Sequence, residues 1–120
     1  MIIAATSDAH VPMYYEELVR AIENMNVKPD LFLIAGDMIH RGDVEEYQIV
    51  CNVLSGKFFC PIVACFGNNE YQELRDKVKE KFKDIRFLDD QSIIVKAGGI
   101  DVGIYGTTGS LETPTPWQKN

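Results

Sequence analysis

The strongest constraint on the fold of this chain is a short apolar run that ends at a glycine and an aspartate. Residues 31–35 read Leu-Phe-Leu-Ile-Ala, and Gly36 and Asp37 follow directly. An uninterrupted apolar run of this length is typical of a strand buried on both faces, as in a parallel sheet covered by helices. Since open α/β sheets bind ligands at the carboxyl ends of their strands, Asp37 is a candidate site residue. A Gly-Asp pair also forms ordinary turns, so the residues at the other strand ends are needed to tell a site from a turn.

Two further expected strands end in polar residues of the same kind. Residues 2–6 form the first strand and lead into Asp8 and His10, whose two-residue spacing lets both side chains point to one side of an extended backbone. A carboxylate and an imidazole together suit a divalent transition metal, although a turn aspartate and a capping histidine would look the same. Residues 61–66 form a third strand, which ends at Gly67-Asn68-Asn69-Glu70. Asn68 offers a metal-ligating amide oxygen or a donor to a phosphoryl oxygen, and an Asn-rich turn is the alternative interpretation.

Amphipathic helices are expected between these strands, so the predicted fold class is α/β. Helical periodicity covers residues 12–26, 44–54 and 71–82, and Asp43 with Glu46 is suited to a capping box. A short strand at 86–88 and a hairpin of strands 92–97 and 100–105, joined by Gly98-Gly99, complete the pattern. The apolar faces expected to be buried are Leu18, Val19, Ile22 and Met25 in the first helix, Ile49, Val50, Val53 and Leu54 in the second, and Leu74, Val78 and Phe82 in the third.

Composition limits the classes of partner. The 120 residues carry a formal net charge of −6, which argues against a broad nucleic-acid surface and against anionic membranes. No apolar run approaches the roughly 20 residues of a membrane span, and the amino-terminal apolar stretch is too short for a signal peptide. Cys51, Cys60 and Cys65 lack metal-site spacing, so we expect buried free thiols and a cytoplasmic protein.

The chain is expected to be a single domain, residues 1–120, and the front part of a longer fold. Thr115, Pro116 and Gln118 form a helix-start signature that lies almost at the end of the sequence. We therefore expect the amino-terminal portion of a larger domain.

Taken together, the three strand-end motifs resemble those of the calcineurin-like metallophosphoesterase family. Its signature is D-x-H, then G-D-x-x-x-x-G, then G-N-H-D/E, and this chain has Asp8-x-His10, Gly36-Asp37-x-x-x-Arg41-Gly42 and Gly67-Asn68-Asn69-Glu70 in the same order. The resemblance spans essentially the whole chain but only the front half of a family domain. It implies an αββα sandwich, here as β-α-β-α-β-α-β plus a hairpin.

The resemblance also implies roles for individual residues. Asp8 and His10 would ligate a first metal ion, Asp37 would bridge two ions, and Asn68 would ligate the second and contact the phosphate. Two divalent cations (Mn, Fe, Zn, Ni or Mg) would then act on a small phosphoester substrate. A dinuclear site with ions roughly 3.5–4 Å apart activates water and clamps the phosphoryl oxygens during in-line displacement.

The chain departs from the family pattern at two points. Asn69 stands where the family has a catalytic histidine, and an amide donates a hydrogen bond but does not titrate near neutrality. Loss of general-acid assistance costs about 10²–10⁴-fold in rate. No histidine follows His40, so the later family ligands are missing from this sequence. Arg41 is a candidate phosphate-binding residue, with a structural ion pair as its alternative, and His40 matches no general family ligand.

Three functions are compatible with these residues. The first is a metal-dependent phosphoesterase, and the second is an inactive relative that serves as a binding or scaffold module. A Rossmann-like nucleotide-binding domain is disfavoured, because no Gly-x-Gly-x-x-Gly follows the first strand. We also expect homo-oligomerisation, since the hairpin would leave apolar surface and a strand edge uncovered.

Overall fold

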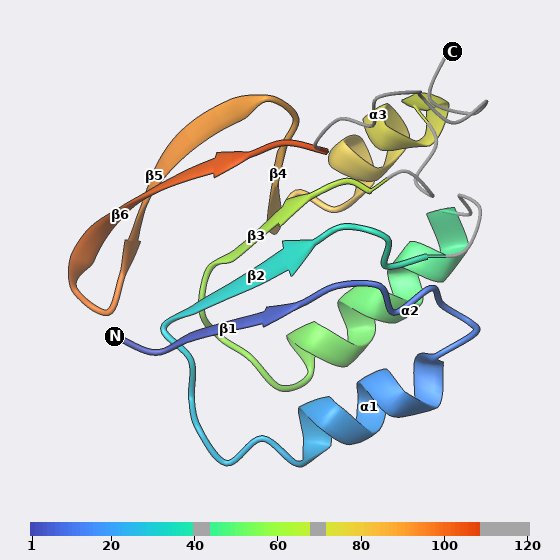
Figure 1. The fold of residues 1–120 in the computed structure, drawn as a ribbon, viewed down its shortest axis with the longest axis horizontal. Coiled ribbons are helices and arrows are strands. Elements are labelled where there is room, and N and C mark those ends of the chain that lie inside the picture. Colours follow the sequence, from blue (N-terminus) through green and yellow to red (C-terminus); the bar gives the residue numbers. More distant parts are fainter. Residues whose placement is uncertain (40–43, 68–71, 109–120) are drawn as a thin grey trace.

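The computed structural model describes residues 1–39, 44–67 and 72–108, and within them strands and helices alternate as predicted. The elements are β1 (Ile3–Thr6), α1 (Tyr15–Glu23), β2 (Leu31–Ala35), α2 (Val44–Ser55), β3 (Ile62–Cys65), α3 (Gln72–Lys81), β4 (Ile85–Leu88), β5 (Gln91–Ala97) and β6 (Ile100–Gly106). Strands β1 to β4 form a parallel sheet in sequence order, and β5 pairs with β6 in a separate antiparallel sheet. The α/β fold class is thereby confirmed, and Figure 1 shows the arrangement.

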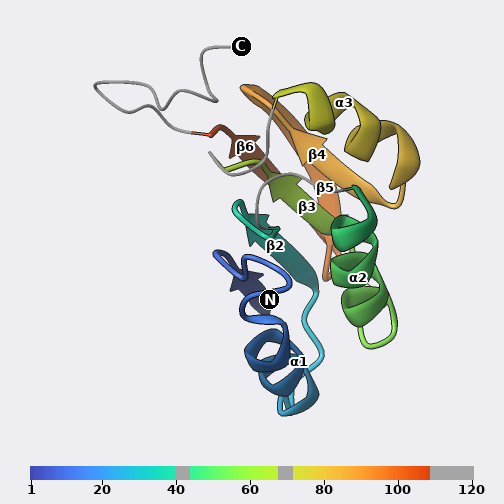
Figure 2. The same cartoon turned by 90° about the vertical axis from the view of Figure 1, so that its right-hand side faces the viewer.

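The central strand β2 is buried on both faces, as its apolar sequence predicts. Phe32 and Ile34 belong to the core formed with the helices, whereas Leu31 belongs to a second core under the β5–β6 hairpin. All three side chains are at most 2% exposed. The molecule therefore has three layers, with the helices on one face of the parallel sheet and the hairpin against part of the other, and Figure 2 shows the helices on one side of the sheet.

The predicted helix faces are buried or partly buried, except at Ile49, and the side chain of Leu74 lies outside the described residues. Leu18 and Ile22 of α1 are buried, as are Val50 and Leu54 of α2. Ile49, expected in the core, is 38% exposed, and the aromatic ring of Tyr47 is buried instead. Tyr47 packs against Phe82, just after α3, and against Phe87 of β4, with ring centroids 5.7 and 5.6 Å apart, so this side of α2 is buried against them.

The hairpin turns where the glycine pair predicts. Gly98 and Gly99 both have positive φ, at 58° and 77°, and Ala97 pairs with Ile100 across the turn. Left-handed backbone at both central residues gives the twist that a two-residue hairpin needs, and glycine adopts it without strain. The apolar face of the hairpin, which includes Val95 and Val102, then covers part of the sheet.

The three cysteines are free, as predicted, but they are partly rather than fully buried. Cys51, Cys60 and Cys65 are each partly exposed. Cys60 lies in the loop before β3 and Cys65 is the last residue of that strand, so neither lies at the centre of the sheet where burial is complete.

No helix within the described ranges is long and apolar enough to cross a bilayer. The helix start expected at Thr115 lies outside the described residues.

Candidate metal centre

The carboxyl ends of the parallel strands bring three of the predicted site residues together. Asp8 and His10 follow β1, and Asp37 follows β2. One potential ligand atom from each of the three lies within 4.8 Å of the other two. His10 Nε2 lies 3.6 Å from Asp8 Oδ1. Residues 27 or more positions apart in sequence therefore meet at one point, because neighbouring parallel strands end at the same edge of the sheet.

The two loops that carry these residues are fixed to each other by backbone hydrogen bonds. The Asp8 N–H donates to the Gly36 carbonyl at 3.1 Å, the His10 N–H to the Asp37 carbonyl at 3.1 Å, and the Val11 N–H to the Met38 carbonyl at 2.9 Å. Val11 and Ile39 form an isolated parallel bridge beyond them, and both side chains are fully buried. The pairing of β1 with β2 thus continues past the strand ends, and the candidate ligands do not sit on independent loops.

All three candidate ligands have backbone in the left-handed region. The φ angles of Asp8, His10 and Asp37 are 56°, 44° and 52°, and in the described ranges Asp90 is the one other non-glycine residue with positive φ. Left-handed backbone at a side-chain-bearing residue costs free energy and persists where the surrounding structure imposes it. Such conformations gather at functional sites, so their coincidence with the three candidate ligands supports a site here.

Gly36 and Gly67 leave the space that Asp37 occupies. A Cβ at Gly36 would lie 2.7 Å from the Gly67 nitrogen, and Gly36 itself has a φ of 90°. A Cβ at Gly67 would overlap the Asp37 carboxylate. Gly67, two residues after β3, therefore lies against the candidate bridging carboxylate, and both glycines are required by close approach.

Neighbouring side chains orient the candidate ligands. The Ser7 hydroxyl donates to Asp8 Oδ2 at 2.8 Å, and the His10 ring meets the Tyr14 ring edge-on with centroids 6.4 Å apart. His10 is 21% exposed and Asp8 is 65% exposed, so the cluster opens to solvent on the Asp8 side. A hydrogen bond such as that from Ser7 helps to orient a side chain that ligates a metal.

The donor set fits a divalent transition metal. Two carboxylates and one imidazole are hard-to-borderline ligands suited to ions such as Mn²⁺, Fe²⁺ or Zn²⁺. Three protein ligands leave coordination positions for water or substrate, which a catalytic site requires. The remaining predicted site residues, Arg41, Asn68 and Asn69, lie outside the described residues, as does His40.

The sequence did not single out Arg75. This residue of α3 contacts Gly67, the first residue of the third strand-end motif. Its guanidinium donates to the Gly67 carbonyl at 3.3 Å and lies 5.3 Å from the centroid of the Phe66 ring. An ion pair of 3.8 Å joins it to Asp89 at the end of β4. Among the described residues Arg75 is the one charged side chain that is buried, at 7% exposure. A lone arginine on an otherwise charged helix face gives no sequence signal for this role.

Comparison with protein families matches residues 1–118 to the calcineurin-like phosphoesterase model. Comparison with curated proteins gives no significant match. The matched region contains all three strand-end motifs and the sheet edge where Asp8, His10 and Asp37 meet. The chain belongs to the calcineurin-like phosphoesterase family.

Proposed function

We propose that this chain binds divalent metal through Asp8, His10 and Asp37 and contributes to metal-dependent hydrolysis of a small phosphoester. The observation that carries the proposal is the convergence of ligand atoms from two strand ends to within 4.8 Å. The family match supports divalent metal chemistry on phosphoesters. When bound, such ions supply Lewis-acid activation of the phosphoryl group and of water.

The chain's own residues would divide the remaining work. Asp37, held between the two loops and against Gly67, is the proposed bridge between two ions. Asn68 is the proposed ligand and phosphate contact, and Arg41 the proposed second phosphate contact. Asn69 would donate a hydrogen bond to the leaving oxygen but would not protonate it, so substrates with good leaving groups are favoured.

Metal binding and turnover test this proposal separately. We expect the purified chain to bind Mn²⁺ in calorimetry and to hydrolyse bis(4-nitrophenyl) phosphate, with both properties lost in Asp37→Asn. Asp90→Asn is the matched control, because Asp90 also has positive φ, at 52°, but accepts its hydrogen bond from Thr107 away from the cluster. Retention of Mn²⁺ binding and activity in Asp37→Asn would refute the assignment.

The second candidate is a binding or scaffold module that holds metal without turnover. The replacement of the family histidine by Asn69 favours it. Mn²⁺ binding without hydrolysis of any 4-nitrophenyl ester in the wild type would establish this alternative. Activity that rises in Asn69→His, most of all on esters with alkyl leaving groups, would instead place the chain among the enzymes.

We also propose that the chain self-associates. Ile94 is 75% exposed, Tyr105 63% and Ile100 55%, all on the hairpin. Ile3 of β1 is 50% exposed on the neighbouring sheet edge. Apolar surface next to a strand edge favours pairing with another chain. Sedimentation that stays monomeric at high concentration would reject this proposal.

A further inference from the structure

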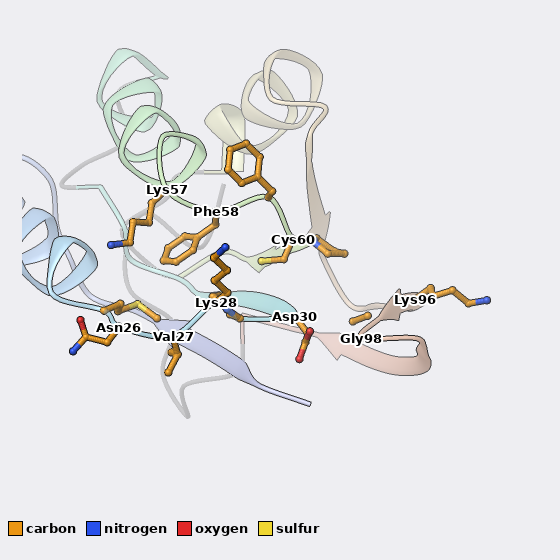
Figure 3. A pocket seen from close by; sticks show the side chains of 14 residues that line it. Asn26, Val27, Lys28, Asp30, Lys57, Phe58, Cys60, Lys96 and Gly98 are labelled. Carbon is orange, nitrogen blue, oxygen red and sulfur yellow. The ribbon is translucent and has the colours of Figure 1, made fainter.

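A cavity of about 560 Å³ lies at the amino ends of the parallel strands, whereas the metal centre lies at their carboxyl ends. It is open to solvent and is lined by the segment before β2, the segment before β3, and the end of β5 with the hairpin turn, which contribute residues 25–30, 57–61 and 96–98. Most of its lining residues precede β2 and β3, so it shares no residue with the strand-end motifs (Figure 3). Its volume falls within the roughly 300–1,000 Å³ of small-molecule sites.

The apolar part of the cavity is a fixed surface. Phe58 is 6% exposed and packs on Phe32 of the core, with ring centroids 4.9 Å apart and an interplanar angle of 31°. Met25, Val27 and Pro61 add aliphatic surface beside it. Because Phe58 is largely covered by the core, it presents only a small part of its ring to the cavity, and Val27, at 48% exposure, supplies more of the apolar lining.

The charged groups around this surface are mainly cationic. Lys28, Lys57 and Lys96 line the cavity, with Asp30 as the one acidic residue, although the whole chain carries a net charge of −6. Asp30 is already engaged, since its Oδ2 accepts the Ile2 N–H at 2.8 Å, and Gly98 of the hairpin turn packs close against it. Cys60 adds no negative charge near neutrality, because burial raises the pKa of its thiol.

Lys28 is the cation best placed to meet a ligand. Figure 3 shows it projecting toward the space between Phe58 and Cys60, whereas Lys96 extends away. Lys57 donates to the Glu23 carbonyl at 3.3 Å, at the carboxyl end of α1. Within the described ranges no carboxylate forms an ion pair with Lys28. An unpaired ammonium beside an apolar lining is complementary to an anion that carries an apolar body.

We propose that this cavity binds a small organic anion, with its acidic group on Lys28 and its apolar body on Val27 and the accessible part of Phe58. The site is separate from the metal centre and does not depend on phosphoesterase activity. Divalent cations are disfavoured by the lysines, and the cavity is too small for a folded partner to enter.

The test uses 2-naphthalenesulfonate as the anionic probe and naphthalene-2-sulfonamide as its neutral counterpart. We expect calorimetry on the full chain to give about 3- to 10-fold tighter binding of the sulfonate, the range between an exposed ion pair and a charge-assisted hydrogen bond. Lys28→Gln should remove this difference, and Lys77→Gln, an exposed position on α3, should preserve it. Equal binding of the two probes by the wild type, or no effect of Lys28→Gln, would overturn the proposal.

Labelling of Cys60 locates the probe. The sulfonate should slow the reaction of Cys60 with a maleimide and leave Cys65, on the other edge of the sheet, unchanged. Unaltered Cys60 labelling at saturating probe would place binding on the exposed apolar residues of the hairpin and reject the cavity. If Cys60 labelling without the probe slows as the protein concentration rises, a second copy of the chain occupies the cavity. That result would also overturn the proposal.

Discussion

Replacement of Arg75 tests how the end of β3 is held at the metal centre. Arg75→Ala removes a charge-assisted hydrogen bond to the Gly67 carbonyl, an ion pair to Asp89 and a cation–π contact with Phe66. A hydrogen bond to a charged group contributes about 1.5–3 kcal/mol, and a partly desolvated cation–π contact about 0.5–2 kcal/mol. Relief of the guanidinium's desolvation offsets part of this loss. We expect the free energy of unfolding to fall by about 2–4 kcal/mol.

Lys79→Ala is the matched control for this substitution. Lys79 Nζ lies 5.9 Å from the same Phe66 ring and 4.0 Å from the same Asp89 carboxylate, but the side chain is 34% exposed. Exposed pairs of this kind contribute roughly 0–1 kcal/mol. The difference between the free energies of unfolding of the two variants in urea therefore measures what the burial of Arg75 and its hydrogen bond to Gly67 contribute to stability. Equal losses of stability in Arg75→Ala and Lys79→Ala would refute the reasoning.

The same substitution should weaken metal binding, because Gly67 packs against the Asp37 carboxylate. We expect Arg75→Ala to bind Mn²⁺ more weakly than Lys79→Ala at a temperature where both variants are folded. Arg75→Lys keeps the charge but not the forked donor geometry of arginine. Relative to Arg75→Ala, it should therefore restore more of the lost stability than of the lost Mn²⁺ affinity. Unchanged Mn²⁺ affinity in folded Arg75→Ala would remove Arg75 as a positioning residue.

Three further predictions concern packing and protonation. Gly67→Ala should abolish Mn²⁺ binding, because the new Cβ overlaps the Asp37 carboxylate; calorimetry that matches the wild type would contradict this. Leu31→Ala should cost about 2–5 kcal/mol in urea unfolding, since Leu31 is fully buried under the hairpin, whereas Ile94→Ala, at 75% exposure, should cost little. Burial, with a smaller contribution from Asp84, raises the pKa of Cys51 from 9.0 to about 12, so native Cys51 should react slowly with iodoacetamide at pH 8 and at the ordinary rate in urea. Because the unfolded thiol loses its proton first as the pH rises, this group's contribution to stability is complete below pH 9 and falls toward pH 12; equal labelling rates in the native and unfolded chain would contradict the shift.

The fold was predictable because each element carries a local signal. The apolar run of β2 predicts its bounds as Leu31–Ala35, and Gly98-Gly99 predicts the hairpin. Residues 12–26 were predicted as one helix, yet α1 spans Tyr15–Glu23, with a turn at Pro12 to Tyr14 taking up its start. The exposure of Ile49 was not predictable, since periodicity describes a stripe on a helix but not which neighbour the stripe meets.

The candidate site was predictable as a list of residue types at strand ends. Asp8, His10 and Asp37 each follow an apolar strand, and parallel pairing brings strand ends to one edge. The role of Arg75 was not predictable, because a helix residue eight positions beyond Gly67 has no local relation to its carbonyl.

What the sequence determined by itself was the order of strands and helices and the ligand chemistry at their ends, since both follow from local periodicity and side-chain type. The tertiary structure decided which of those ends meet, how Gly36 and Gly67 make room for Asp37, and where a cationic cavity opens between three loops. These features depend on contacts between residues far apart in the chain, and such contacts exist only after the layers have packed.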